Sequence, residues 1–146
     1  MEQVKIDNFY RENPQVHYPE YVTLDSENCA NIRASLSKKL GLNTPADSMT
    51  LVNLVDRHGK LCEEFNCKED DFNLKRVLSS LGISWPEYVF VNWYRYDIID
   101  KLRLCDLTNY FDDIWYEDVD DIDIFDDMLE WVLSVTHYGQ IKILKI

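Results

Sequence analysis

The chain has 146 residues, of which 46% are hydrophobic and 13% aromatic, and it carries a net charge of −12. This length and composition are typical of one folded globular domain and exclude a disordered chain. No apolar stretch approaches the roughly 20 residues that cross a bilayer, and the first residues have neither the basic nor the apolar segment of an export signal. We therefore expect a single cytoplasmic domain, residues 1–146, with no membrane partner.

The first 22 residues predict an irregular N-terminal arm. Pro14 and Pro19 interrupt any regular pattern, and four aromatic residues lie around them. We expect these rings to pack on the core, and we expect no regular helix in residues 1–22.

Residues 25–82 are predicted to be helical. Asp25 or Ser26 can cap a first helix. Apolar residues then recur three or four positions apart up to Leu40, and Gly41 follows as a stop. Because such residues share one helix face, this helix is expected to be amphipathic.

A second helix is predicted from Thr44, which can cap a helix whose first position is Pro45. Its apolar face continues to Phe65. Gly59 interrupts that face and costs a helix about 1 kcal/mol relative to alanine. We expect a kink or a break at this glycine.

A third, shorter helix is expected after Asp70–Asp71, with Gly82 as its end. After Pro86 the helical period gives way to alternation among β-branched and aromatic residues. Tyr88–Trp93 is therefore the first predicted strand.

Residues 86–146 are predicted to be mainly antiparallel sheet with one short helix. Asp106 opens that helix, which runs from Leu107 to about Phe111. The further strands are Ile122–Phe125, Leu129–Thr136 and Gln140–Ile146, joined by short turns. The expected fold class is α+β, with N-terminal helices packed on a C-terminal antiparallel sheet of about four strands.

Alternation in the strand predicted after residue 128 assigns its faces. Every second residue is apolar, and side chains two positions apart share a face of a strand. The face expected to meet the helices consists of Leu129, Trp131, Leu133 and Val135.

Negative charge is concentrated towards the C-terminus. Residues 104–141 hold 11 acids and no lysine or arginine, whereas the rest of the chain holds 16 acids and 15 bases. A field of one sign repels nucleic-acid phosphates and speeds encounter with basic proteins. We expect a basic protein partner and no nucleic acid.

Tyrosine and tryptophan residues lie among these acids, and three interpretations remain open. The acids can form a solvated face that binds nothing, or they can surround aromatic anchors on a protein-binding surface. In the third interpretation the acids bind Ca²⁺ or Mg²⁺. Counted from Asp118, however, the segment lacks the glycine and the final glutamate of a calcium loop, since Leu129 stands at the twelfth position.

The protein-binding interpretation is the one we favour, because solubility alone does not require acids to cluster on one segment. It predicts contact residues that are either acidic or aromatic. They are Asp112, Asp113, Trp115, Tyr116, Glu117, Asp118, Asp120, Asp121 and Asp123.

Signals of catalysis are sparse. His58 and Cys62 stand four residues apart and would share one face of a helix, as a base and a nucleophile could. The four cysteines are scattered and are expected to be reduced thiols, the spacing of a zinc site is missing, and the isolated glycines form no phosphate loop. We assign no catalytic residue, metal ligand or cofactor. A metal-assisted or carboxylate-based hydrolase and a nucleic-acid mimic stay open as alternatives to an inhibitor.

The stretch Tyr110–Tyr116, followed by Asp121–Asp126, Trp131 and His137–Gly139, resembles small uncharacterised bacterial domains over roughly Tyr88–Ile146. A helical first half followed by an acidic antiparallel sheet is similar to immunity proteins of bacterial toxin systems. This resemblance in layout implies an intracellular inhibitor that binds and neutralises a basic toxin or effector domain.

Overall fold

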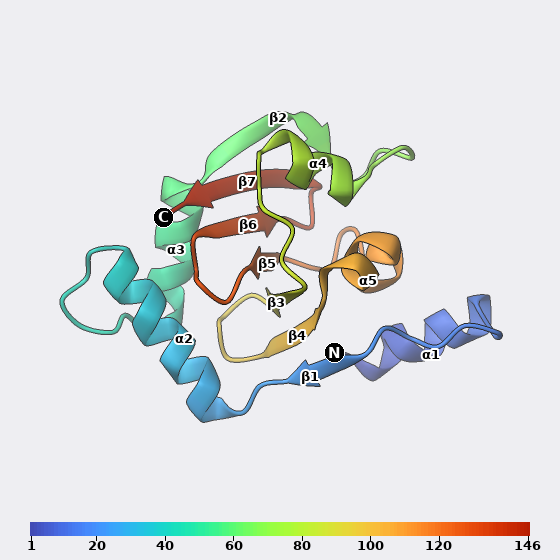
Figure 1. Cartoon of the computed structure of the whole chain (residues 1–146), viewed down its shortest axis with the longest axis horizontal. Coiled ribbons are helices and arrows are strands. Elements are labelled where there is room, and N and C mark those ends of the chain that lie inside the picture. Colours follow the sequence, from blue (N-terminus) through green and yellow to red (C-terminus); the bar gives the residue numbers. More distant parts are fainter.

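Seven strands form one antiparallel sheet with helices on both faces in the computed structural model, which describes residues 1–146 (Figure 1). The helices are α1 Gln3–Glu12, α2 Ser26–Lys39, α3 Ser48–His58, α4 Leu74–Ser80, α5 Leu104–Asn109 and α6 Phe111–Ile114. The strands are β1 Tyr21–Thr23, β2 Lys60–Asn66, β3 Tyr88–Asn92, β4 Ile99–Arg103, β5 Ile122–Phe125, β6 Trp131–Val135 and β7 Gln140–Lys145. The strand order is β1-β4-β3-β5-β6-β7-β2.

The sheet separates two hydrophobic clusters. The larger cluster has 22 buried residues and contains side chains of α1, α4, α5 and α6, whereas a cluster of 10 lies under α2 and α3. Strand β6 contributes to both, because Leu133 points into the first cluster and its neighbour Val132 into the second. Both faces of the central strands are therefore buried.

The α+β class is confirmed, but the sheet has seven strands instead of about four, and its helices are not confined to the N-terminal half. Trp131, Leu133 and Val135 share a buried face beneath helices, as predicted. Leu129 does not join them. It precedes β6 with a φ of 51° and packs in the α2 and α3 cluster.

Several local predictions are confirmed. The Asp25 carboxylate caps α2 by accepting the Asn28 backbone N–H at 2.8 Å, and Gly41 follows with a φ of 80°. Strands β3 and β5 occupy the predicted segments almost to the residue. These elements carry a strong local signal, a cap and stop for α2 and alternation for the strands.

The prediction of an irregular arm over residues 1–22 is wrong, because α1 and β1 both lie in it. The two buried residues of α1, Lys5 and Phe9, are four positions apart and so share a helix face. Because one of the two is a lysine, the sequence does not show the apolar spacing that normally indicates a helix. The prolines fall between α1 and β1 and leave both elements intact.

The second predicted helix, which was expected to start at Thr44 and to continue to Phe65, is wrong at both ends, although the chain does break at Gly59. Helix α3 begins at Ser48, with Asp47 as the cap, and ends before Gly59. The following residues form β2, which pairs with β7 and is an edge of the sheet. His58 and Cys62 therefore lie on different elements and share no helix face.

The structure also contains strand β4, which the sequence patterns did not predict. The short helix expected from Leu107 is α5, which starts earlier, at Leu104. Strand β4 carries Asp100 and Lys101 between apolar residues, so its alternation is weak. None of the helices has the length and apolar character needed to cross a membrane.

Candidate protein-binding surface

The nine residues predicted as contact residues do not form one ring. Five line a common hollow, namely Asp112, Asp113, Trp115, Tyr116 and Glu117. The other four are Asp118, Asp120, Asp121 and Asp123, which do not line it. These acids are close together in the sequence. Successive residues of a loop or strand point in different directions, however, so their side chains reach different parts of the surface.

The hollow has a volume of about 670 Å³ and lies between the end of α1, the turn after β2, α6 and the loop that follows α6. We call it the acidic hollow. Its acids are Glu12, Glu69, Asp70, Asp112, Asp113 and Glu117, and its only base is Lys68. Segments far apart in the sequence therefore bring six carboxylates to one concave surface.

The hollow has an aromatic wall. Trp115 is buried, stacks on Phe111 with ring centroids 5.7 Å apart, and donates its indole N–H to the Asp120 carbonyl at 2.9 Å. This hydrogen bond holds the Trp115 ring in the core, so the ring lines the hollow without projecting from it. Tyr116, which is half-buried, offers the more accessible ring.

The carboxylates of the hollow affect one another. Burial raises the pKa of Asp113 above its ordinary value, and the negative charges of Glu12 and Asp112 raise it further. Neither Asp112 nor Asp113 has an ion-pair partner within the chain. A cation placed in the hollow would relieve this repulsion.

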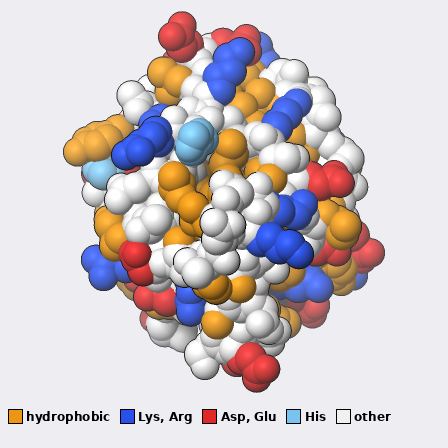
Figure 2. All heavy atoms as spheres, turned by 90° about the vertical axis from the view of Figure 1, so that its left-hand side faces the viewer, with side chains coloured by type: hydrophobic (Ala, Val, Ile, Leu, Met, Phe, Trp, Pro, Cys, Tyr) orange, Lys and Arg blue, Asp and Glu red, His pale blue; other side chains and the backbone are white.

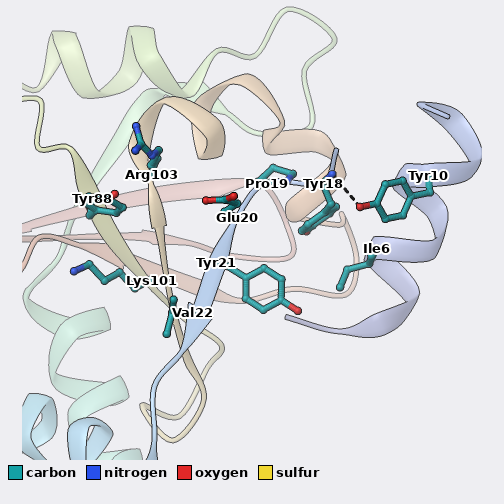
Figure 3. Close-up of a pocket in the computed structure, with 10 residues that line it drawn as sticks. All are labelled: Ile6, Tyr10, Tyr18, Pro19, Glu20, Tyr21, Val22, Tyr88, Lys101 and Arg103. Atoms are coloured by element: carbon teal, nitrogen blue, oxygen red, sulfur yellow. Dashed lines mark hydrogen bonds between the residues drawn. The ribbon is translucent and has the colours of Figure 1, made fainter. Parts of the chain in front are cut away.

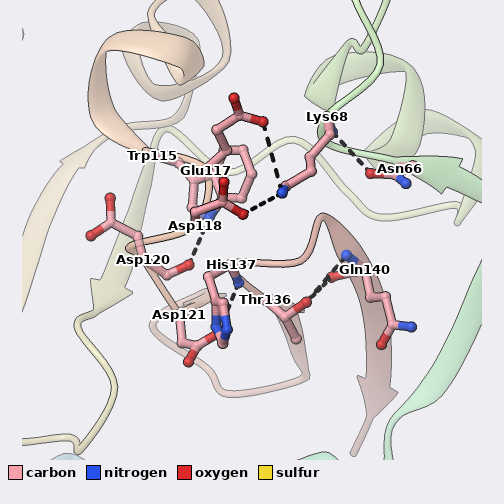
Figure 4. Close-up of polar contacts among 10 residues, drawn as sticks. All are labelled: Asn66, Lys68, Trp115, Glu117, Asp118, Asp120, Asp121, Thr136, His137 and Gln140. Carbon is pink, nitrogen blue, oxygen red and sulfur yellow. Dashed lines mark hydrogen bonds and ion pairs between the residues drawn. The ribbon is translucent and has the colours of Figure 1, made fainter.

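Lys68 extends towards two acids at the edge of the hollow, as Figure 4 shows. Its Nζ lies 2.5 Å from Asp118 and 3.9 Å from Glu117. The hydrogen bond to Asp118 raises the pKa of the lysine. Asp118 is thereby engaged by the chain's own cation, although both side chains remain accessible to solvent.

Asp120 belongs to a buried ion pair. Its carboxylate contacts the ammonium of Lys5, which is fully buried and also donates to the Ile114 carbonyl at 2.8 Å. The Tyr116 backbone N–H donates to the same carboxylate at 2.7 Å, and the Tyr116 ring centroid lies 4.0 Å from the ammonium. Asp120 therefore joins α1 to the wall of the hollow and is unavailable to a partner.

Asp123 is buried on the opposite face of the sheet. Its neighbours Ile122 and Ile124 belong to the larger cluster, so alternation directs Asp123 towards α2 and α3. The Ser134 hydroxyl donates to it at 2.5 Å and the Asn92 amide at 3.0 Å. Burial raises the pKa of Asp123, and these hydrogen bonds oppose the rise.

Asp121 does not line the acidic hollow and pairs instead with His137 (Figure 4). Its Oδ1 accepts the His137 backbone N–H at 2.9 Å and lies 2.9 Å from Nδ1 of the same residue. Asp121, Asp123 and His137 line a separate cavity of about 260 Å³ beside α3. Two of the predicted acids thus share this cavity with a histidine.

The features expected of a reactive or metal site are weak in this chain. No three His, Cys, Asp or Glu side chains converge in a way that could hold a metal ion. Cys67 borders the acidic hollow, but burial, followed by the charge of Asp112, raises the pKa of its thiol to about 12. This thiol is neutral at physiological pH and so is a poor nucleophile.

Charge is distributed differently on the side of the molecule where α2 and α3 lie. Figure 2 shows that basic and acidic side chains are interspersed with apolar ones on this side, without a large area of one sign. The concentration of acids in the hollow is therefore local, because the side that carries α2 and α3 does not share it.

Glu12, Glu69 and Asp70 were missed because they lie in the part of the sequence where acids and bases balance. The run of acids from Glu69 to Asp71 was a usable local signal. The position of Glu12 depended on recognising α1, whose period a buried lysine disguises.

No family model matches the chain, and comparison with curated proteins and with solved structures finds no similar protein.

Proposed function

We propose that this protein is an inhibitor of the immunity type, which binds a basic toxin or effector domain through the acidic hollow. The observation that carries the proposal is the convergence of six carboxylates on a concave surface whose only base is Lys68. Carboxylates steer a basic partner, and a hollow with an aromatic wall can receive an inserted lysine or arginine side chain.

The structural acids support this proposal indirectly. The Lys5–Asp120 pair and the buried indole of Trp115 fix the wall of the hollow before any partner arrives. A surface that is already organised loses little conformational entropy on binding. Rigidity of this kind suits an inhibitor that must occlude its target tightly.

The two alternatives have less support. A carboxylate-based hydrolase would use the cavity beside α3, but both Asp123 oxygens accept hydrogen bonds from Ser134 and Asn92, and Asp121 is engaged by His137. A nucleic-acid mimic requires carboxylates in a row that follows a phosphate backbone. The acids of the hollow instead surround a concavity with an aromatic wall.

Comparative affinity capture from the native host tests the proposal. The bait is the wild-type chain beside a variant that carries Asp112→Asn, Asp113→Asn and Glu117→Gln. The matched control carries Glu27→Gln, Glu63→Gln and Glu64→Gln, three exposed acids that do not line the hollow. We expect a basic protein that wild type and control retain and that the hollow variant loses by at least about tenfold.

Two results would contradict the proposal. One is a partner retained equally by all three baits, which would place the contact elsewhere. The other is a partner without a basic surface.

A further inference from the structure

A second hollow, at the opposite end of the sheet from β2, has the reverse charge. It measures about 750 Å³ and follows β1, the strand at the end of the sheet (Figure 3). We call it the edge groove. Its basic residues are Lys101 and Arg103, and its only acid is Glu20.

The backbone of β1 is open on the side away from β4. Val22 lies opposite Lys101, and the same register places Leu24 opposite Ile99, whose carbonyl accepts the Leu24 N–H at 2.9 Å. Hydrogen-bonded positions alternate along an antiparallel strand, so Val22 is bonded to β4. The backbone groups of Tyr21 and Thr23 therefore point outward, where no other strand lies.

The two sides of the groove differ in chemistry. Residues directly opposite in adjacent strands share a face, and the pairs Tyr88–Arg103, Phe90–Lys101 and Val22–Lys101 form one side. On the other side Tyr21 extends towards Ile6 of α1, as Figure 3 shows, and its ring centroid lies 6.2 Å from that of Tyr18. The side chains of a strand laid along β1 would alternate between these two sides. One set would contact the cations, and the other set would contact an apolar wall rich in tyrosine.

The cations are arranged on an aromatic surface. Lys101 Nζ lies 4.9 Å from the Tyr88 ring centroid, and the Arg103 guanidinium lies 5.5 Å from the same ring. Lys101 has no ion-pair partner, and Arg103 has only Glu87 at 3.7 Å. Val22, between these cations and the open edge, is 63% exposed. The lining of the groove therefore carries one net positive charge, in a chain of net charge −12. A positive groove favours a ligand that brings negative charge.

We infer that the edge groove binds an extended acidic segment of a partner protein, which adds to the sheet as a strand beside β1. Backbone hydrogen bonds to Tyr21 and Thr23 supply affinity, as in other complexes formed by strand addition. Acidic side chains contact Lys101 and Arg103, and the intervening apolar side chains contact Tyr21 and α1. This surface is separate from the acidic hollow and takes a partner of opposite charge.

The test uses short capped peptides with the full-length protein. One alternates valine with glutamate, a second alternates valine with lysine, and a third is the valine–glutamate peptide with alternate amides N-methylated. The N-methyl groups remove the donors of one strand edge and leave the charge unchanged. Calorimetry measures affinity, and hydrogen exchange measures protection of the Tyr21 and Thr23 amides.

We expect the valine–glutamate peptide to bind at least about tenfold more tightly than either of the others and to slow exchange of the Tyr21 and Thr23 amides. Lys101→Gln with Arg103→Gln should weaken it by about tenfold. The control Lys38→Gln with Lys39→Gln, which changes the charge equally on α2, should not. No binding at millimolar peptide, equal affinity for the lysine peptide, insensitivity to N-methylation, or pairing of β1 with a second copy of the chain would each overturn the inference.

Discussion

The acids of the C-terminal segment divide into two groups with different surroundings. Asp120 and Asp123 are more than nine-tenths buried, and each accepts at least two hydrogen bonds or charge contacts. Asp112 and Asp113 border an open hollow and form no ion pair within the chain. Acids that are neighbours in the sequence thus include both structural groups and groups free for a partner.

This difference teaches that clustering of charge in a sequence overstates the charge available on a surface. A buried carboxylate must be compensated where it lies, because desolvation of an unpaired charge is expensive. An exposed carboxylate needs no partner within the chain. Variants of the two groups should therefore separate effects on folding from effects on binding.

The largest expected effect comes from breaking the buried pair. Lys5→Met leaves the Asp120 charge enclosed without its cation and should lower the free energy of unfolding by about 3–5 kcal/mol, measured by urea denaturation. Adding Asp120→Asn to Lys5→Met should recover part of this loss, since no uncompensated charge then remains. A double variant that is no more stable than Lys5→Met would show that the pair is not coupled in this way.

A smaller, pH-dependent effect is expected for Asp123→Asn. Burial raises the folded-state pKa of Asp123, so folding favours the protonated, neutral carboxyl group. That contribution to stability is fully present below the unfolded pKa of about 4 and is lost as pH rises through the folded pKa. The asparagine has no such dependence.

The stability of Asp123→Asn relative to wild type should therefore increase as pH rises above about 4 and then level off. Urea denaturation at a series of pH values measures this difference. A difference that is constant with pH would mean that Asp123 titrates alike in the folded and unfolded chain.

The same contrast explains what could be predicted from sequence. Caps and alternation are local, and so α2, β3 and β5 were predictable from a few residues each. Helix α1 was not, because its buried face contains Lys5, whose place depends on an acid 115 positions away in the sequence. Strand β2 gains its stability from pairing with β7, which no local pattern encodes.

The acidic hollow was predictable only in part for the same reason. Asp112, Asp113 and Glu117 come from the acidic segment itself. Glu12 and Asp70 reach the hollow through tertiary packing, and the burial of Asp120 and Asp123 follows from partners elsewhere in the chain. A sequence reports how many acids a segment has, whereas the fold decides which remain free.

The smallest effect on folding is expected for the hollow variant, which carries Asp112→Asn, Asp113→Asn and Glu117→Gln. The same variant gives the most direct test of the proposed docking role. Its free energy of unfolding should stay within about 0.5 kcal/mol of wild type. Its association rate constant with the captured partner, measured by stopped flow over a range of salt concentrations, should fall by about tenfold at low salt and lose most of its salt dependence. An association rate and salt dependence equal to those of wild type and of the Glu27, Glu63 and Glu64 control would contradict docking at the acidic hollow.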